Sequence, residues 1–68
     1  MIEWKPIKST KRLSIGDIVF YKSETQEFLA KVRFTSDNNY LVISPYSNPA
    51  VGIVVLYLSY IFTPHETL

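Results

Sequence analysis

Few side chains in this sequence could carry catalytic chemistry. His65 is the only imidazole, there is no cysteine, and only two glycines are available for a phosphate-binding loop. The six carboxylates are scattered along the chain. No two of them lie together in an apolar stretch, where their pKa values could be driven apart so that one acts as an acid and the other as a base. One histidine without cysteines does not make a zinc site. We therefore expect a non-enzymatic protein with no catalytic residue, no metal and no cofactor.

Basic and aromatic side chains could instead bind a ligand or a partner. The candidates are Trp4, Lys11, Arg12, Tyr21, Lys31, Arg33, Tyr40, Tyr46 and Asn48. Their basic members would merge into one surface if the N-terminal segment lay beside residues 28–34, and the rings could stack on bases. Six acidic residues nearly cancel seven basic ones, leaving a net charge of +1. A solvated strand face is therefore the alternative interpretation.

The pattern along the chain is that of short strands. Segments rich in β-branched and aromatic residues, separated by polar turns, are found at residues 18–22, 28–34, 40–44 and 53–58. Residues 59–62 are expected either to turn through a short 3₁₀ segment or to form a last strand. Residues 2–7 are expected to be an extended arm or short edge strand, since Pro6 disfavours helix and Trp4 offers a large anchor.

Residues 28–34 show the clearest alternation. The residues expected on the apolar face are Phe28, Ala30, Val32 and Phe34. The other face carries Glu27, Lys31 and Arg33 but also Leu29. One buried and one solvated face is typical of an antiparallel sheet, so residues 27–44 are predicted to form a hairpin.

The C-terminal half has no formal charge over residues 38–64, although it holds five of the nine Tyr and Phe residues. Within it, residues 53–58 are apolar on both faces, which a monomer of this size can hardly cover. An uncharged edge strand invites pairing with another chain. We therefore expect a homo-oligomer with interface candidates Val54, Val55, Leu56, Tyr57, Leu58 and Tyr60. The alternative is that the arm and the loop at residues 45–50 cover this strand within one subunit.

Three segments resemble a known family. They are Leu13-Ser-Ile-Gly-Asp-Ile-Val-Phe-Tyr21, Phe28-Leu-Ala-Lys-Val32 and Tyr40-Leu-Val-Ile43, and they are similar to the opening strands of SH3-like barrels of the Tudor and KOW type. The resemblance covers about residues 13–60 and implies a fold. The resemblance does not imply a particular ligand, because the sequence shows neither an evident four-aromatic cage nor the glycine of a KOW loop.

The predicted fold is therefore all-β: a small five-stranded SH3-like barrel, mainly antiparallel, with an extended N-terminal arm. Its parts are the arm at residues 1–12, the barrel at residues 13–62 and a C-terminal tail at residues 63–68. No membrane association is expected, because residues 1–12 lack an apolar signal core and residues 51–62 are shorter than the ~20 apolar residues of a membrane span.

The expected function is that of a small cytoplasmic binding protein that self-associates and acts as an inhibitor or adaptor on a macromolecular partner. A first alternative is a phage-type anti-defence protein that sequesters a nucleotide-like small ligand between subunits. An AT-rich source, bacterial or viral, fits the composition: Ile, Lys, Asn, Tyr and Phe number 24, against 10 for Gly, Ala, Arg and Pro. The second alternative is nucleic-acid binding through the basic arm.

Overall fold

Short strands dominate the computed structural model, which describes residues 1–36 and 40–66. In chain order the elements are β1 (Ile2–Pro6), the 3₁₀ turn η1 (Thr10–Arg12), β2 (Ile18–Lys22), β3 (Glu27–Thr35), β4 (Leu41–Pro45), β5 (Ile53–Val55), the 3₁₀ turn η2 (Leu58–Tyr60) and β6 (Ile61–Glu66). Both alternatives for residues 59–62 are thus realised in succession, a 3₁₀ turn followed by a strand. The described part of the chain contains no helix long and apolar enough to cross a membrane.

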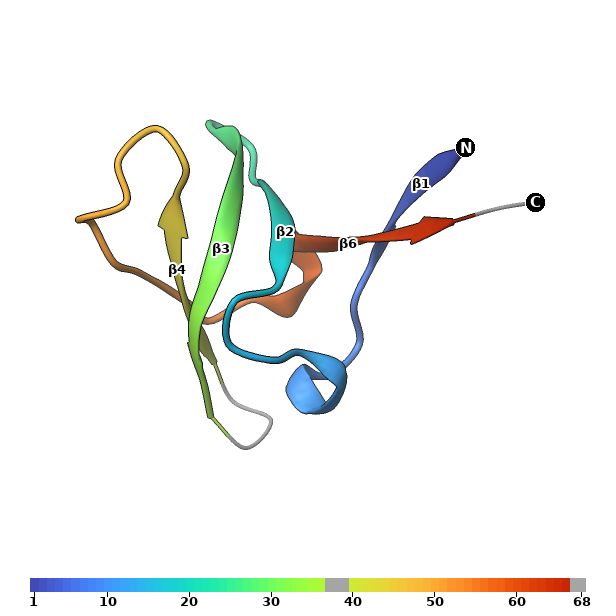
Figure 1. The fold of residues 1–68 in the computed structure, drawn as a ribbon, viewed down its shortest axis with the longest axis horizontal. Coiled ribbons are helices and arrows are strands. Elements are labelled where there is room, and N and C mark those ends of the chain that lie inside the picture. The colour runs from blue at the N-terminus through green and yellow to red at the C-terminus, as the bar shows by residue number, and fades with distance from the viewer. Residues whose placement is uncertain (37–39, 67–68) are drawn as a thin grey trace.

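The six strands form one antiparallel sheet in the order β1-β6-β2-β3-β4-β5. Figure 1 shows the sheet bending so that β3 and β4 lie on one side of the molecule and β1 and β6 on the other. The Cα radius of gyration of 11.3 Å is close to the ~11 Å of a compact domain of this length. The predicted all-β, barrel-like fold is confirmed.

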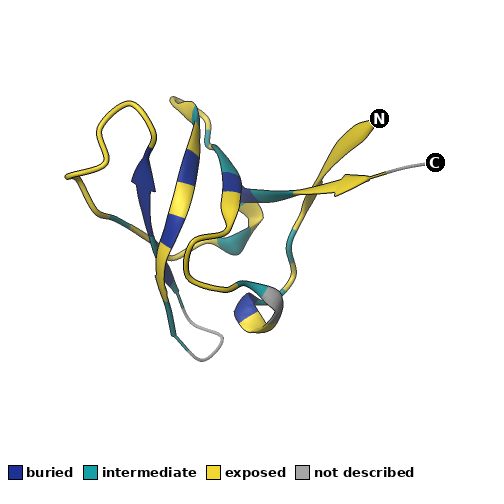
Figure 2. Cartoon of the chain, in the orientation of Figure 1, coloured by how far each residue is buried: buried dark blue, intermediate teal, exposed yellow. Residues whose placement is uncertain are grey.

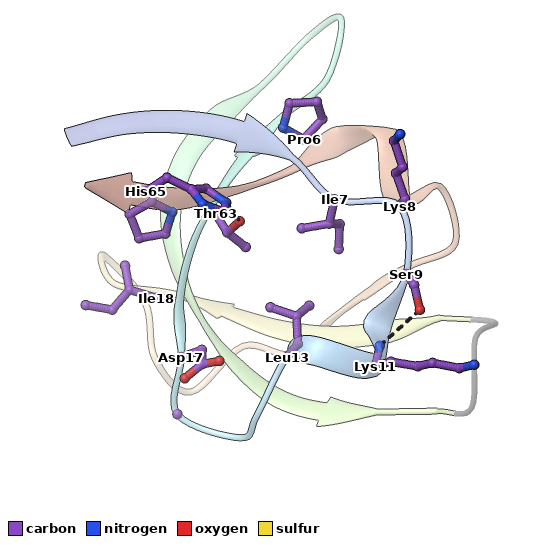
Figure 3. A pocket seen from close by; sticks show the side chains of 12 residues that line it. Pro6, Ile7, Lys8, Ser9, Lys11, Leu13, Asp17, Ile18, Thr63 and His65 are labelled. Carbon is purple, nitrogen blue, oxygen red and sulfur yellow. Dashed lines mark hydrogen bonds between the residues drawn. The ribbon is translucent and has the colours of Figure 1, made fainter. Parts of the chain in front are cut away.

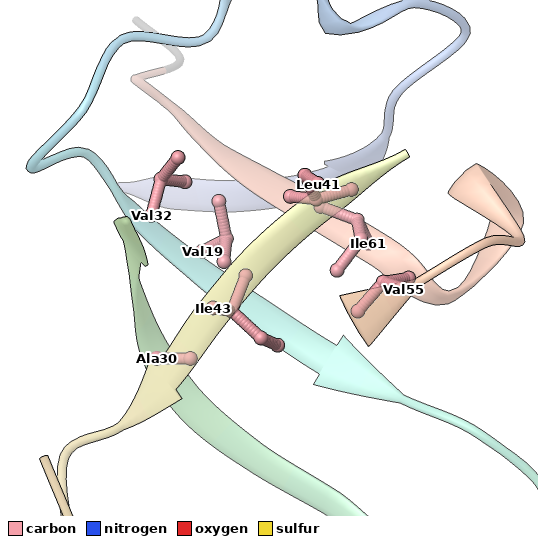
Figure 4. Packing of buried hydrophobic residues seen from close by; sticks show 7 residues of the cluster. All are labelled: Val19, Ala30, Val32, Leu41, Ile43, Val55 and Ile61. Atoms are coloured by element: carbon pink, nitrogen blue, oxygen red, sulfur yellow. The ribbon is translucent and has the colours of Figure 1, made fainter. Parts of the chain in front are cut away.

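The core lies inside this bend and is built from aliphatic side chains. Its buried members are Val19, Ala30, Val32, Leu41, Ile43, Val55 and Ile61 (Figure 4). Every strand from β2 to β6 contributes at least one of them, because alternate residues of a strand point to the same face. Figure 2 shows this alternation along β3, where buried and exposed residues follow one another.

A β-bulge in β3 makes the predicted position of Phe34 on the core face wrong. Val32 pairs with Ile43, but the next pair is Phe34 with Val42, so an extra residue is accommodated on β3 between Val32 and Phe34. The bulge moves Phe34 from the core face to the outer face, where its side chain is exposed. Ala30 and Val32 are buried as predicted, while Phe28 is half-buried against the core.

The N-terminal arm and the C-terminal tail are not free segments. They pair with each other as β1 and β6, from Ile2 opposite Glu66 to Pro6 opposite Phe62. The strand count is therefore six instead of five, and residues 63–66 continue a strand where a tail was expected. Pro64 is tolerated within this strand because of the way its neighbours pair. β6 pairs with β2 only at Ile61 and Phe62, so the missing amide of Pro64 costs no bond on that side.

Side-chain and turn contacts fasten the segment between β1 and β2 to the end of β3. The hydroxyl of Thr10, which is buried, donates to the carbonyl of Ser36 at 2.9 Å. The amide of Gly16 donates to the carbonyl of Val32 at 2.8 Å, and Gly16 has a φ of +98°, which a residue with a side chain rarely adopts. This turn directs the chain into β2.

Candidate binding surfaces

The basic candidates come from two elements, η1 and β3. Lys11 is exposed in η1, and Lys31 and Arg33 are exposed on β3. The structure describes the backbone of Arg12 within η1 but not its side chain. The predicted merger required the N-terminal segment to lie beside β3. Instead β6 and β2 separate β1 from β3, so only η1 approaches the end of that strand, through the Thr10–Ser36 bond.

A pocket of about 880 Å³ lies between η1, the turn before β2 and the end of β6 (Figure 3). Ile7 and Leu13 point into it from opposite sides. Lys8 and Lys11 also line the pocket, but Figure 3 shows their amino groups pointing away from its centre. The pocket is therefore apolar at its centre and has no converging positive charges.

One hydroxyl–imidazole pair lies at the edge of this pocket. Thr63 Oγ1 is 3.1 Å from Nε2 of His65, since residues two apart in a strand share a face. The sequence analysis did not predict this contact, because it assigned His65 to a C-terminal tail. Both side chains face solvent, and His65 has no second hydrogen-bond partner among the described residues. An oriented base of a nucleophilic enzyme has such a partner.

The described residues also offer no cluster for a metal. No group of three or more histidine or carboxylate side chains within residues 1–36 and 40–66 could hold a metal ion.

An apolar patch on the outer face of the sheet was also missed. The strand pairs Phe62–Phe20 and Phe20–Leu29 place these three side chains in a row across β6, β2 and β3. Trp4 joins the row from β1, with its ring centroid 6.0 Å from that of Phe20. Together with Lys22 they line a cleft of about 460 Å³. The signal in the sequence was Leu29, an apolar residue on the otherwise charged face of its strand.

Four aromatic rings meet at the junction of β2, β3 and η2. Tyr21 stacks on Phe28 at a centroid distance of 4.9 Å and meets Tyr60 edge-on at 5.9 Å. Tyr60 in turn meets Tyr57 at 5.7 Å. Tyr21 was predicted as a ligand residue and the latter two tyrosines as interface residues; the fold brings the three together. Local sequence patterns do not predict this cluster, because its members come from segments far apart in the chain.

The interface candidates divide between the core and the surface. Val55 is 3% exposed and packs in the core, and Leu58 is half-buried against it. Val54 is 59% exposed, and Leu56 and Tyr57 are also exposed. Val55 and Leu58 are therefore assigned to the interior, leaving the other candidates for contact with a partner. The register explains this division, since Val55 opposes buried Leu41 while Val54 opposes Val42 on the outer face.

The remaining candidates lie apart from one another. Tyr40 is half-buried beside Phe34, with ring centroids 6.0 Å apart. Tyr46 and Asn48 are exposed in the turn after β4, where the amide of Tyr46 donates to the carbonyl of Leu29 at 3.1 Å. These three residues do not converge on one ligand site with Trp4 or Lys11.

Comparisons with known proteins return no match: no family model, no curated protein and no solved structure is similar to this chain. The likeness to SH3-like barrels therefore stays a resemblance of short segments, whereas the all-β architecture rests on the strand pairing itself.

Proposed function

We propose that this chain is a small non-enzymatic binding protein that self-associates through the edge strand β5 and acts on a macromolecular partner as an inhibitor or adaptor. The observation that carries this proposal is the contrast between the two edges of the sheet. β1 and β5 are the outermost strands in the described part of the chain. They differ in charge and in proline content, two of the features that normally keep an edge strand from pairing.

The β1 edge is protected. It contains Glu3, Lys5 and Pro6, and charged residues and proline are the usual means by which natural sheets prevent pairing at an edge. The β5 edge has none of these. Its sequence is Ile-Val-Val, the residues that follow it are Leu56 and Tyr57, and no charged residue occurs in the surrounding stretch of residues 38–64. Its only protection is its short length.

A second copy of the chain is the simplest partner for this edge. Twofold symmetry would bring β5 against its own copy, and the same patch would then serve both subunits. Exposed Val54 within β5 and exposed Leu56 directly after it would add apolar contact, and Tyr57 is of a residue type that is enriched at interfaces. The two alternatives have less support, since the amino groups of Lys8 and Lys11 near the 880 Å³ pocket point away from its centre and two strands separate β1 from β3.

The test is size-exclusion chromatography with light scattering at micromolar concentration. The wild type is expected to elute as an oligomer, and Val54→Lys as a folded monomer, because a lysine at this exposed position places like charges against each other across the twofold axis. Ile15→Lys is the matched control, since Ile15 is also exposed but lies in the turn before β2. A monomeric wild type, or an oligomer that tolerates Val54→Lys, would refute self-association through β5.

A further inference from the structure

The cleft on the outer face is a second surface, independent of β5. We propose that it binds a short acidic, amphipathic segment of a partner protein, with a bulky apolar side chain seated between Trp4, Phe20, Phe62 and Leu29 and a carboxylate on Lys22. This proposal goes beyond self-association, because it names a different surface and the chemistry of the macromolecule that it recognises.

The cleft has the form of a side-chain pocket. Its lining residues come from four adjacent strands, so the sheet holds their spacing fixed. The rings of Trp4 and Phe20 contact each other with planes tilted by 51°, and both of them line the cleft. The volume of about 460 Å³ falls within the ~300–1,000 Å³ of typical ligand pockets.

The exposure of the lining residues indicates that the cleft lacks its natural cover. Trp4 is 38% exposed and Leu29 is 45% exposed, although both are large apolar side chains. Aromatic residues that combine apolar area with few rotatable bonds are the usual anchors of protein interfaces, tryptophan above all. Nothing in the described part of the chain covers this patch, whereas the aliphatic core on the other side of the sheet is fully buried.

The charges around the cleft select the partner. Lys22 lines the cleft and forms no ion pair with any described residue; Glu27, directly opposite on β3, is also unpaired. The exposed charges of the four strands that line the cleft sum to +1, from Lys5, Lys22, Lys31 and Arg33 against Glu3, Glu27 and Glu66. An apolar cleft beside a net positive rim is complementary to a segment that carries an apolar side chain next to carboxylates.

Nucleic acid fits this surface less well than such a peptide. A single-stranded platform presents flat rings along a basic groove, so that successive bases can stack. Here the rings are tilted, two of the four apolar lining residues are half-buried phenylalanines, and the only lining charge is Lys22. A cleft with one cation suits one carboxylate better than a chain of phosphates.

The experiment uses peptides selected without a prior choice of sequence. Random twelve-residue peptides displayed on phage are selected on the immobilised wild type and counter-selected on Leu29→Lys. The enriched peptides that lack tryptophan are then synthesised with a fluorescent label and titrated by anisotropy. Because Trp4 is the only tryptophan of the chain, a change in its emission reports directly on occupation of the cleft.

We expect the enriched peptides to contain a bulky apolar residue flanked by Asp or Glu, to shift the emission of Trp4, and to bind more weakly at higher salt. Leu29→Lys and the milder Leu29→Ser should weaken binding at least tenfold. Lys22→Glu should reverse the preference from acidic to basic flanks. Ile15→Lys is the control, since it introduces the same charge at another exposed aliphatic residue, in the turn before β2 and outside both surfaces, and should leave peptide binding unchanged.

Three outcomes would overturn the proposal: no peptide is enriched, the enriched peptides lack carboxylates, or they bind the Leu29 variants as tightly as the wild type. A fourth is quenching of Trp4 by a labelled dT12 oligonucleotide that competes with the peptides, which would assign the cleft to nucleic acid. The peptide-binding test and the self-association test can fail independently, because Val54→Lys changes the β5 edge and none of the residues that line the cleft.

Discussion

Neighbouring valines on β5 should differ sharply in their contribution to stability. Val55 is 3% exposed and opposes Leu41, whereas Val54 is 59% exposed and opposes Val42. Truncating Val55 to alanine removes roughly two buried methylene equivalents, about 1.6 kcal/mol of transfer free energy. The cavity left behind adds to this cost, so the loss should be about 2 kcal/mol. Val54→Ala removes side-chain atoms that are mostly in water and should cost about 0.5 kcal/mol or less.

These values translate into melting temperatures that are easy to separate. In a domain of this size 1 kcal/mol corresponds to about 4–8 °C, so Val55→Ala should lower the Tm by about 8–16 °C and Val54→Ala by less than about 4 °C. The measurement is thermal unfolding followed by circular dichroism. It should be made at a protein concentration below that at which the chain associates, because association makes the Tm depend on concentration.

The comparison tests the register of β5 directly. A slip of one residue against β4 would turn Val54 inward and Val55 outward, and the order of the two Tm shifts would be reversed. Equal shifts would mean that the two valines are buried to the same extent. Either result would refute the assignment of the two faces, and with it the choice of Val54 as the position for an interface mutation.

Three further predictions concern the fold. Thr10→Val should destabilise the protein by about 1–2 kcal/mol in urea unfolding, because the carbonyl of Ser36 loses its donor, while Thr10→Ser should retain most of the stability. Gly16→Ala should cost about 1 kcal/mol from backbone strain alone, since φ is +98° and a Cβ there would meet nothing within 4 Å; an unchanged Tm would contradict this. Deletion of residues 63–68 should shift the emission of Trp4 to longer wavelength, because β1 loses the strand that pairs with it. A dispensable tail would leave the spectrum unchanged.

Local patterns in the sequence were sufficient for the strands that build the core. The alternation of Ala30 and Val32 predicts their burial, and the β-branched content of residues 18–22 and 53–58 places β2 and β5, although β5 proper is shorter than predicted. The 3₁₀ turn and the strand that follows it were both among the alternatives for residues 59–62. In each case the deciding interactions lie between close neighbours in the chain.

Features that depend on distant segments could not be predicted in this way. The bulge before Phe34 is a property of the pairing with β4 and leaves no mark on the alternation of β3 itself. The aromatic cluster brings Tyr21 to Tyr60, and the outer cleft brings Trp4 to Leu29. Both depend on the order of the strands in the sheet, which no single segment of the sequence predicts. The assignment of residues 63–66 to a tail was wrong because their partner strand, β1, lies far away in the sequence.

The position of β6 has a consequence for the way in which the molecule is made. β6 lies between β1 and β2 in the sheet but follows both of them in the chain, so β1 has no strand partner until β6 has been synthesised. Pairings between such distant segments close late and fold slowly. During translation Trp4 and the uncharged residues of β5 would therefore be exposed together on an incomplete sheet. An incomplete sheet of this kind would expose apolar residues until β6 is made, and faster translation of β6 would shorten this interval.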